Sequence, residues 1–345
     1  MMVSALVGDS EIEALFTDDA DLAAMLRFES VLAGSEAAAG LIPASHAAHI
    51  VRACTTFAAD RPALQAGMAR DGVVVPELLR QLRAAIGEPE SQDLHRGATS
   101  QDVVDASLVL RLAPALEILD DRLVALDAAL GALGDRDGAV SLMAQTRMQQ
   151  ALPFRAADKV RTWRAPLGRH RDWLAELRPR LLVLQLGGPV GTRGALGAQA
   201  EAVAAEMARR LGLGNAKSWH SQRDGIVEFG GWLAMVAGSL GKMGQDVALM
   251  VQNEVGTAAL SGGGTSSAMA HKHNPVAAEL LVTLARFTAG LAGTLGGALV
   301  HENERSGSAW TLEWLVLPQL LVATGAALRT ALSLATTLSF PSRPA

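Results

Sequence analysis

Two long stretches of this chain carry few charged side chains, and this limits the folds that the chain can adopt. Residues 224–256 and 276–300 are apolar or glycine at most positions. In the first stretch Glu228, Lys242 and Asp246 fall within about 40° of one another on a helical wheel. A helix that is apolar on nearly every side has to be covered by neighbours on most of them. The pattern therefore predicts a long helical bundle whose burial is completed by oligomerisation.

The composition supports an all-α fold. Half of the residues are hydrophobic, but aromatic residues make up only 4% and tyrosine is absent. The apolar content therefore comes from alanine, leucine and valine, and the first two are among the strongest helix formers. Small residues at three- and four-residue spacing let neighbouring helices approach closely. The two stretches contain such glycines at Gly231, Gly238, Gly241, Gly244, Gly290, Gly293, Gly296 and Gly297.

Further helices are indicated by periodic apolar residues and by glycine and proline stop signals. We expect the chain to divide into an N-terminal helical domain, residues 1–100, and a central domain of long helices, residues 101–345. The expected helical ranges outside the two apolar stretches are 18–39, 43–58, 76–86, 103–133 and 152–178, the last after a break at Pro153.

Charge, cysteine content and hydropathy argue against several classes of protein. The formal net charge is −5 and there is no basic block, so nucleic acid is not an expected partner. The single Cys54, and an N-terminus unlike a signal peptide, indicate a cytoplasmic protein. Charge-free runs near the C-terminus, such as residues 314–328, are shorter than the ~18–20 residues that a membrane span needs, so we expect no membrane association. The histidines show no metal-ligand spacing, so we expect no metal and no cofactor.

The strongest chemical signal lies in residues 262–275, which read GGGTSSAMAHKHNP. A glycine-rich loop presents two serine hydroxyls, and a cation and an amide follow, Lys272 and Asn274. Proline at the first helical position and asparagine at the N-cap predict that a helix starts at Pro275 with Asn274 as its cap. Helix N-termini with a nearby lysine bind carboxylates well.

This string resembles the signature G-S-S-x-M-P-x-K-x-N-P of the fumarase/aspartase superfamily. The resemblance implies that Ser266 is the base that removes a proton α to a carboxylate, with Lys272 and Asn274 beside it. Two positions depart from the signature: Thr265 replaces a glycine, and Ala270 replaces the proline, which loosens the loop. Neither departure removes a chemical group. The histidines beside Lys272 have a plainer interpretation as polar loop residues.

A second block, residues 95–102, resembles the H-x-G-x-T-S-x-D region of the same superfamily. The resemblance implies that the hydroxyls of Thr99 and Ser100 hold a substrate carboxylate. It also places His95 among the catalytic residues and Gln101 among the substrate-binding residues. Without the resemblance, a Thr-Ser-x-Asp sequence before a helix is a capping device. The two acidic residues that follow, at positions 102 and 105, are interpreted as helix-start residues.

A third block, residues 145–153, distinguishes among members of the superfamily. Lyases that expel an amine carry a histidine in a segment R-T-H-x-x-x-A-x-P, and Arg147 stands at that position here. The sequence Gln-Gln-Ala-Leu-Pro at residues 149–153 resembles the corresponding segment of the 3-carboxy-cis,cis-muconate cycloisomerases of the β-ketoadipate pathway. A carboxylate leaving group, with a pKa near ~4, needs no general acid. Arg147 is therefore expected to add positive charge for a tricarboxylate, and Gln149 to hold a carboxylate.

A fourth segment, residues 301–314, resembles the short bacterial cycloisomerases and offers Arg305 and Ser306 as carboxylate ligands. Trp310 and Trp314, four residues apart, are interpreted as core packing. The resemblance further implies a homotetramer whose active site is shared by three subunits, and a small polycarboxylate as the substrate. The chain departs from the family in one respect: many members carry a further C-terminal helical domain, which we expect to be absent here. Two alternatives stay open: a different lyase, such as an adenylosuccinate-type enzyme, and a non-catalytic helical scaffold derived from such enzymes.

Overall fold

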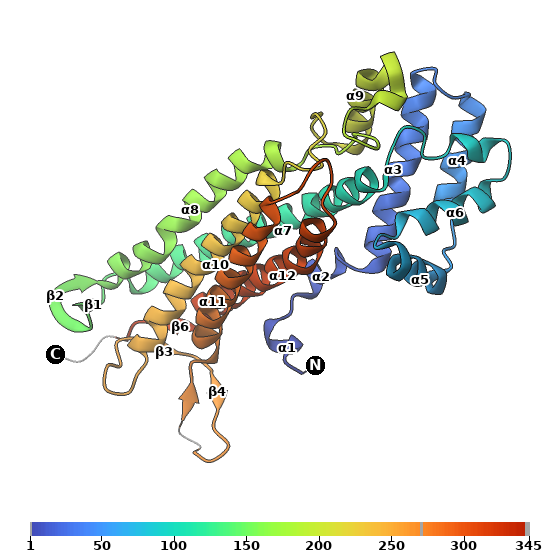
Figure 1. Cartoon of the computed structure of the whole chain (residues 1–345). Coiled ribbons are helices and arrows are strands. Elements are labelled where there is room, and N and C mark those ends of the chain that lie inside the picture. Colours follow the sequence, from blue (N-terminus) through green and yellow to red (C-terminus); the bar gives the residue numbers. More distant parts are fainter. Residues whose placement is uncertain (1, 270–271, 342–345) are drawn as a thin grey trace.

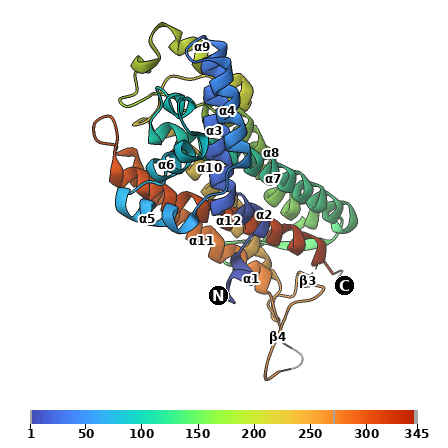
Figure 2. The same ribbon diagram turned by 90° about the vertical axis from the view of Figure 1, so that its right-hand side faces the viewer.

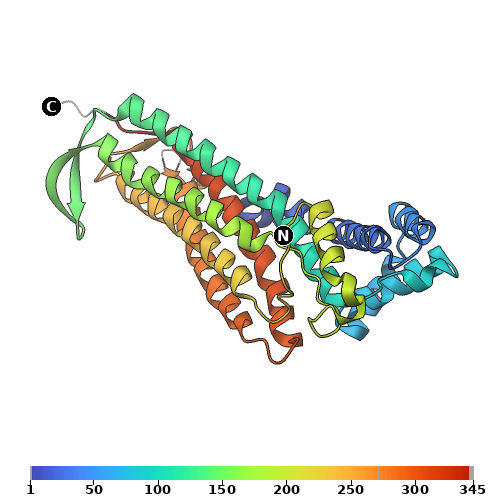
Figure 3. The same ribbon diagram turned by 90° about the horizontal axis from the view of Figure 1, so that it is seen from above.

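The computed structural model describes residues 2–269 and 272–341, and most of this part of the chain is helical. Figure 1 shows an elongated molecule in which long helices run side by side and shorter helices gather at one end. Short two-stranded sheets lie at the opposite end and below the bundle (Figures 1 and 3). The all-α fold predicted from composition and periodicity is confirmed.

Five long helices form the bundle, and α10 packs along α11 over most of its length. Gly241 and Gly244 explain the close approach, since a Cβ atom at Gly241 would lie 2.4 Å from the Cβ atom of Ala285. At Gly244 it would lie 2.5 Å from the carbonyl oxygen of Ala278. The long helices are α7 Ser100–Asp137, α8 Ala156–Leu181, α10 Asp224–Met250, α11 Val276–Gly296 and α12 Gly307–Thr337.

Five of the shorter helices form a second group around the start of α7 (Figure 2): α3 Asp18–Ala38, α4 Ala44–Thr56, α5 Arg61–Asp71, α6 Val75–Ile86 and α9 Ala200–Leu211. Two others, α1 Ser4–Val7 and α2 Ser10–Ala14, pack against α12 of the bundle. The 3-10 turns are η1 Glu90–Asp93, η2 Gly194–Gln199 and η3 Gly297–Leu299. The predicted helices 18–39, 43–58 and 76–86 correspond to α3, α4 and α6. Helices α5 and α9 were not predicted, although α5 has an Asp60 N-cap and a left-handed Gly72 at its end.

Apolar side chains bury themselves in two clusters. The larger cluster fills the bundle, and the smaller one joins α3, α4, α6 and α9 to the first turns of α7. Helix α7 takes part in both, with Val103 and Ala106 in the small cluster and the leucines from Leu108 to Leu133 in the large one. A single rigid helix therefore links the two groups. The division of the chain at residue 100 stays a prediction.

The segment before α8 differs from the prediction. Residues 152–155 were expected to begin a helix, but they lie in a β-hairpin of β1 Ser141–Thr146 and β2 Gln149–Arg155. Arg147 and Met148 form its turn with φ of 48° and 66°, the left-handed conformation that a two-residue hairpin turn requires. A proline cannot donate a ladder hydrogen bond, but Pro153 is tolerated in a strand that has only one partner. Short strands also include β3 Ala259–Leu260, β4 Gly264–Thr265, β5 His273–Asn274 and β6 Leu338–Ser339.

Two helices are long and apolar enough to cross a membrane, by length and composition alone. They are Val276–Leu299, which contains Glu279 and Arg286, and Gly307–Thr337, which contains Glu313 and Arg329. The charge-free runs within them stay shorter than a membrane span needs, and the expectation of no membrane association stays a prediction. The most apolar part of α12 is 67% buried, which is the character of a core helix, whereas that of α11 is only 28% buried. Helix α11 thus presents an apolar face that the other described residues do not cover.

Candidate active site

Residues more than 200 positions apart meet at the N-terminus of α7. The Nε atom of Arg305 donates a hydrogen bond to Oε1 of Gln101 at 2.9 Å, and its Nη2 atom donates to Oγ1 of Thr99 at 3.2 Å. Thr99 is the N-cap of α7 and forms a capping box with Asp102. A helix N-terminus carries a partial positive charge and a guanidinium carries a full one, so this corner favours a carboxylate ligand.

A cavity of about 760 Å³ opens beside this corner. Ser100 and Arg305 line it together with Trp310 and Trp314 of α12. Ser306 was predicted to hold a carboxylate with Arg305, but its side chain is buried and its Oγ atom accepts the N–H of Ala309 as the N-cap of α12. Of these predicted carboxylate ligands, Ser100 and Arg305 line the cavity and Ser306 does not.

Gln101 has a different role from its neighbours. Its side chain is fully buried, its Nε2 atom donates to the carbonyl oxygen of His220 at 2.9 Å, and its Oε1 atom accepts from Arg305. Both ends of the amide are therefore occupied by protein groups. Gln101 therefore orients Arg305 at this corner. The resemblance implied instead that Gln101 contacts the substrate.

Asp102 was interpreted as a helix-start residue, and that interpretation is incomplete. Its buried carboxylate accepts the N–H groups of Gly187 at 2.7 Å and Gly188 at 2.8 Å, and lies 2.8 Å from Nε2 of His220. These partners are 85 to 118 residues away along the chain. Sequence reasoning missed them because no local pattern marks a partner at that distance. Asp102 fixes the loop at 187–188 against the start of α7.

Asp105 belongs to a second buried network. Arg223, at the start of α10, donates to Asp105 at 2.7 and 3.1 Å and to Glu313 of α12 at 2.8 and 2.5 Å. The indole N–H of Trp310 also donates to Asp105, at 2.9 Å. Burial alone lowers the pKa of Arg223, but the two carboxylates outweigh it and raise the pKa above its usual range. The network joins three long helices directly below the cavity.

The glycine-rich segment lies at a different place, below the bundle in Figure 2. Strands β4 and β5 pair there, and the Oγ atom of Ser266 accepts backbone N–H groups from Ala268 at 3.3 Å and Met269 at 3.1 Å. Such donors stabilise negative charge on an oxygen. Lys272 is exposed three residues after Met269. Ala270 and His271, which the sequence prediction included, lie outside the described residues.

The predicted cap of α11 is wrong by one residue. Asn274 pairs with Gly264 in the β4–β5 ladder, so its backbone is committed to a strand. Pro275 occupies the N-cap position, without a side-chain cap hydrogen bond, and the helix begins at Val276. The amide of Asn274 is consequently not used for capping.

Arg147 and Gln149 form a third group. Both are exposed at the β1–β2 turn, beyond the far end of α7 (Figures 1 and 3). Helix α7 has 38 residues and therefore spans about 57 Å at ~1.5 Å per residue. Helix α10 has 27 residues, about 40 Å, and separates the Arg305 corner from the Ser266 loop. Within one chain the Arg305 corner therefore meets neither the Ser266 loop nor the Arg147 turn.

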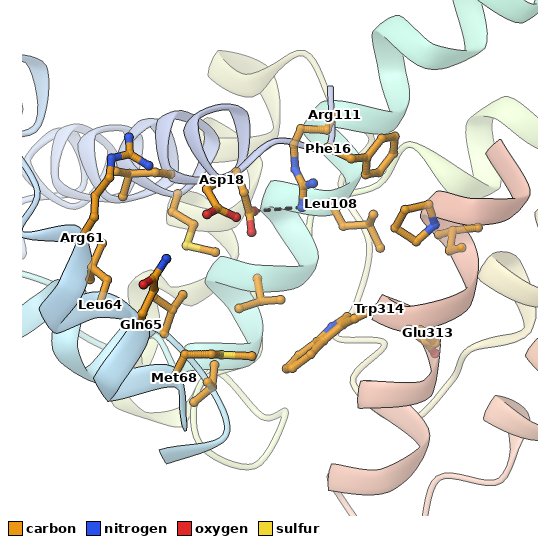
Figure 4. A pocket seen from close by; sticks show the side chains of 18 residues that line it. Phe16, Asp18, Arg61, Leu64, Gln65, Met68, Leu108, Arg111, Glu313 and Trp314 are labelled. Carbon is orange, nitrogen blue, oxygen red and sulfur yellow. Dashed lines mark ion pairs between the residues drawn. The ribbon is translucent and has the colours of Figure 1, made fainter. Parts of the chain in front are cut away.

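A more enclosed cavity of about 350 Å³ lies on the other side of Trp314, between α3, α5, α7 and α12 (Figure 4). It contains no predicted site residue. Its two arginines are already paired, Arg61 with Asp19 and Arg111 with Asp21. This cavity therefore has no spare cation for a polycarboxylate, and the corner at Arg305 is the better candidate.

Comparison with known proteins is consistent with this geometry. Residues 7–290 match the family model described as lyase. The chain is 42% identical over 330 residues to a 3-carboxy-cis,cis-muconate cycloisomerase of Pseudomonas aeruginosa, covering 94% of this chain and 72% of that one. A protein of the same name from Pseudomonas putida is 40% identical, covering 92% and 77%. The crystal structure of the 3-carboxy-cis,cis-muconate lactonizing enzyme from Pseudomonas putida superposes with a TM-score of 0.92 at 38% identity, covering 99% and 77%.

Proposed function

This chain belongs to the lyase family of the fumarase/aspartase fold, and from that membership we propose that it closes 3-carboxy-cis,cis-muconate to carboxymuconolactone. The observation that best supports this is Arg305, hydrogen-bonded at the N-terminus of α7 in the wall of a 760 Å³ cavity. Such a corner suits one carboxylate of a small polycarboxylate. The described residues contain no cluster of ligands for a metal ion.

In the proposed reaction a carboxylate oxygen of the substrate forms a bond to a carbon of its own conjugated diene. The π electrons move towards a neighbouring carboxylate, which becomes an enediolate, and Ser266 delivers a proton to the adjacent carbon. Ser266 then regains its proton from water. The acid forms of the substrate and the lactone contain the same atoms, so the reaction is an isomerisation. In the reverse direction Ser266 is the base, and the N–H groups of Ala268 and Met269 stabilise its alkoxide.

The other predicted residues bind carboxylates in this proposal. Thr99 and Ser100 lie at the N-terminus of α7, Lys272 and Asn274 lie in the Ser266 loop, and Arg147 and Gln149 lie in the hairpin turn. In the reverse direction the bond that breaks releases a carboxylate, which needs no general acid, so an arginine at position 147 is compatible with this chemistry and unsuited to amine expulsion.

We propose that a cytoplasmic homotetramer brings the three groups together. Two facts support it. Helix α10 places the Ser266 loop about 40 Å from the Arg305 corner, and α7 places the Arg147 turn about 57 Å from it. Helix α11 also has an apolar face that the other described residues leave uncovered. Phe287 on α11 is 48% exposed and Met235 on α10 is 49% exposed. Apolar surface of this kind is buried in the core of an obligate interface.

The first test is turnover of 3-carboxy-cis,cis-muconate, followed as loss of the ultraviolet absorbance of the conjugated diene. We expect rapid loss with the wild-type protein. The Ser266→Ala variant should be slower by about 10²–10⁴, since proton transfer by a positioned group contributes that much.

Ser267→Ala is the matched control, because it removes a neighbouring hydroxyl from the same loop and is expected to keep most of the activity. Equal losses in both variants would contradict the role of Ser266. A folded wild-type protein without turnover would reject the substrate, and a panel of succinyl compounds would then test the adenylosuccinate-type alternative. Inactivity on all of them would favour the non-catalytic scaffold.

A further inference from the structure

His95 is held by a buried carboxylate that no sequence motif indicates. The Nδ1 atom of its ring lies 2.6 Å from Oε1 of Glu29 on α3, 66 residues earlier in the chain. The side chain of Glu29 is 1% exposed and that of His95 is 10% exposed. The backbone of His95 has a φ of 63°, a conformation that a histidine keeps only when its surroundings impose it. The contact with Glu29 is one of those constraints.

The second ring nitrogen of His95 points away from this buried contact. Among the described residues its Nε2 atom has no hydrogen bond, and it is not one of the atoms that are both buried and unpartnered. The atom therefore reaches accessible surface. The contact with Glu29 fixes which nitrogen faces inward, because the ionised carboxylate can only accept the Nδ1 proton.

We propose that Glu29 is the positioning residue of His95, keeping its ring as an imidazolium whose Nε2–H donates to a second carboxylate of the substrate. The proposal rests on the proposed function, since it assigns His95 to the same substrate as Arg305. His95 stands four residues before Thr99. In this arrangement the histidine binds charge and does not transfer the proton, which remains the task of Ser266.

The charges around His95 support this state. Burial lowers its pKa, but the charge and hydrogen bond of Glu29 outweigh burial, so the pKa of His95 lies above its usual value. The raised pKa favours the imidazolium, and its charge is lost as the pH rises through that pKa. Other charged or titratable groups around this pair are Glu36 of α3, Cys54 of α4, Arg83 of α6, Asp93 of η1, Arg96 in the following loop and Asp102 of α7.

Glu36 offers a matched control on the same helix. It is fully buried, two turns after Glu29, and neither of its carboxyl oxygens has a hydrogen-bond partner within the described residues. Burial, followed by the charge of Glu29, raises the pKa of Glu36 to about 8. Glu36 is therefore a neutral acid at pH 7, which glutamine imitates in shape and charge, and it makes no contact with His95.

The experiment compares the pH dependence of KM in the full-length wild type, Glu29→Gln and Glu36→Gln. In the wild type KM should rise once the pH exceeds the raised pKa of His95. In Glu29→Gln that rise should begin about 1–3 pH units lower, the usual effect of an adjacent opposite charge, with a smaller change in kcat. Glu36→Gln should follow the wild-type profile below pH 8. Identical profiles for wild type and Glu29→Gln would overturn the proposal, and so would equal shifts in both variants.

A measurement that needs no activity separates this proposal from the reaction itself. Nitrogen-15 NMR of the wild-type protein, with the His95 signal assigned by its loss in His95→Asn, reports the protonation of both ring nitrogens. We expect both to be protonated at pH 7. A neutral His95 at pH 7 would overturn the proposal even if the enzyme turns over its substrate, whereas an imidazolium in a protein without turnover would reject only the proposed function. Because the wild type is used, the result stands if Glu29→Gln does not fold.

Discussion

Consecutive side chains at the start of α7 point in three directions and do three different things. Ser100 lines the cavity, Gln101 turns inward to hold Arg305, and Asp102 reaches the loop at 187–188. Since each residue of a helix is rotated by about 100° from the last, adjacent residues cannot share one task. The sequence motif groups Ser100, Gln101 and Asp102 together, but in the folded chain their side chains have different partners.

The residue-scale prediction concerns Asp102. In Asp102→Asn one carboxylate oxygen becomes an N–H₂ group, which cannot accept the N–H of Gly187 or Gly188. A buried donor left without an acceptor costs about 1–3 kcal/mol, so the free energy of unfolding should fall by that amount. Urea unfolding would measure it.

The control for Asp102 lies on the same helix. Asp120 pairs with Arg171 at 2.7 Å on the accessible side of α7, and exposed ion pairs contribute about 0–1 kcal/mol. Asp120→Asn should therefore change the stability little. If both variants lost the same stability, the buried network would not be what holds the loop.

At the scale of elements, the contact between α10 and α11 depends on missing side chains. Glycines allow the two helices to approach until atoms of Ala285 and Ala278 fill the space that a Cβ would need. The apolar faces then pack over most of the length of both helices. Glycine itself is a poor helix former, so these positions contribute through packing and not through propensity.

Gly241→Ala tests this arrangement. The added Cβ atom would lie 2.4 Å from the Cβ atom of Ala285, so the helices must separate, at a cost of about 1–3 kcal/mol typical of overpacking. Gly168→Ala on α8 is the matched change, because a Cβ there meets nothing within 4 Å and alanine favours the helix by up to about 1 kcal/mol. The two thermal midpoints should move in opposite directions. A gain of stability in Gly241→Ala would contradict the close packing.

At the scale of the whole molecule, the lengths of α7 and α10 limit which candidate site residues can meet within one chain. The rigid helices α7 and α10 hold the Arg305 corner at one end and the β1–β2 hairpin and the β4–β5 loop towards the other (Figure 1). A bend that brought them together would have to break these helices. In the proposed tetramer the residues of one active site come from several copies, and the exposed apolar face of α11 is where such copies would meet.

Phe287→Asp should prevent that assembly. A charge buried without a partner costs about 3–5 kcal/mol at each interface, so light scattering should show monomers, and turnover should disappear with the tetramer. Phe287→Leu keeps the apolar character and should keep both. A tetramer of unchanged mass for Phe287→Asp would show that this part of α11 faces solvent.

The sequence by itself determined the helical class and most of the long helices, because periodicity and helix propensity are local properties. The four blocks of candidate site residues came from their resemblance to the fumarase/aspartase superfamily, and the roles proposed for them rest on that resemblance. The sequence-based prediction was wrong at residues 152–155 and at the cap of α11, where strand pairing with a neighbouring segment overrides local preference. It also missed Glu29, His220 and Arg223, which only the tertiary structure places beside His95, Asp102 and Asp105. These contacts depend on how the helices pack against one another, and the spacing of residues along the chain does not predict which of them will be neighbours.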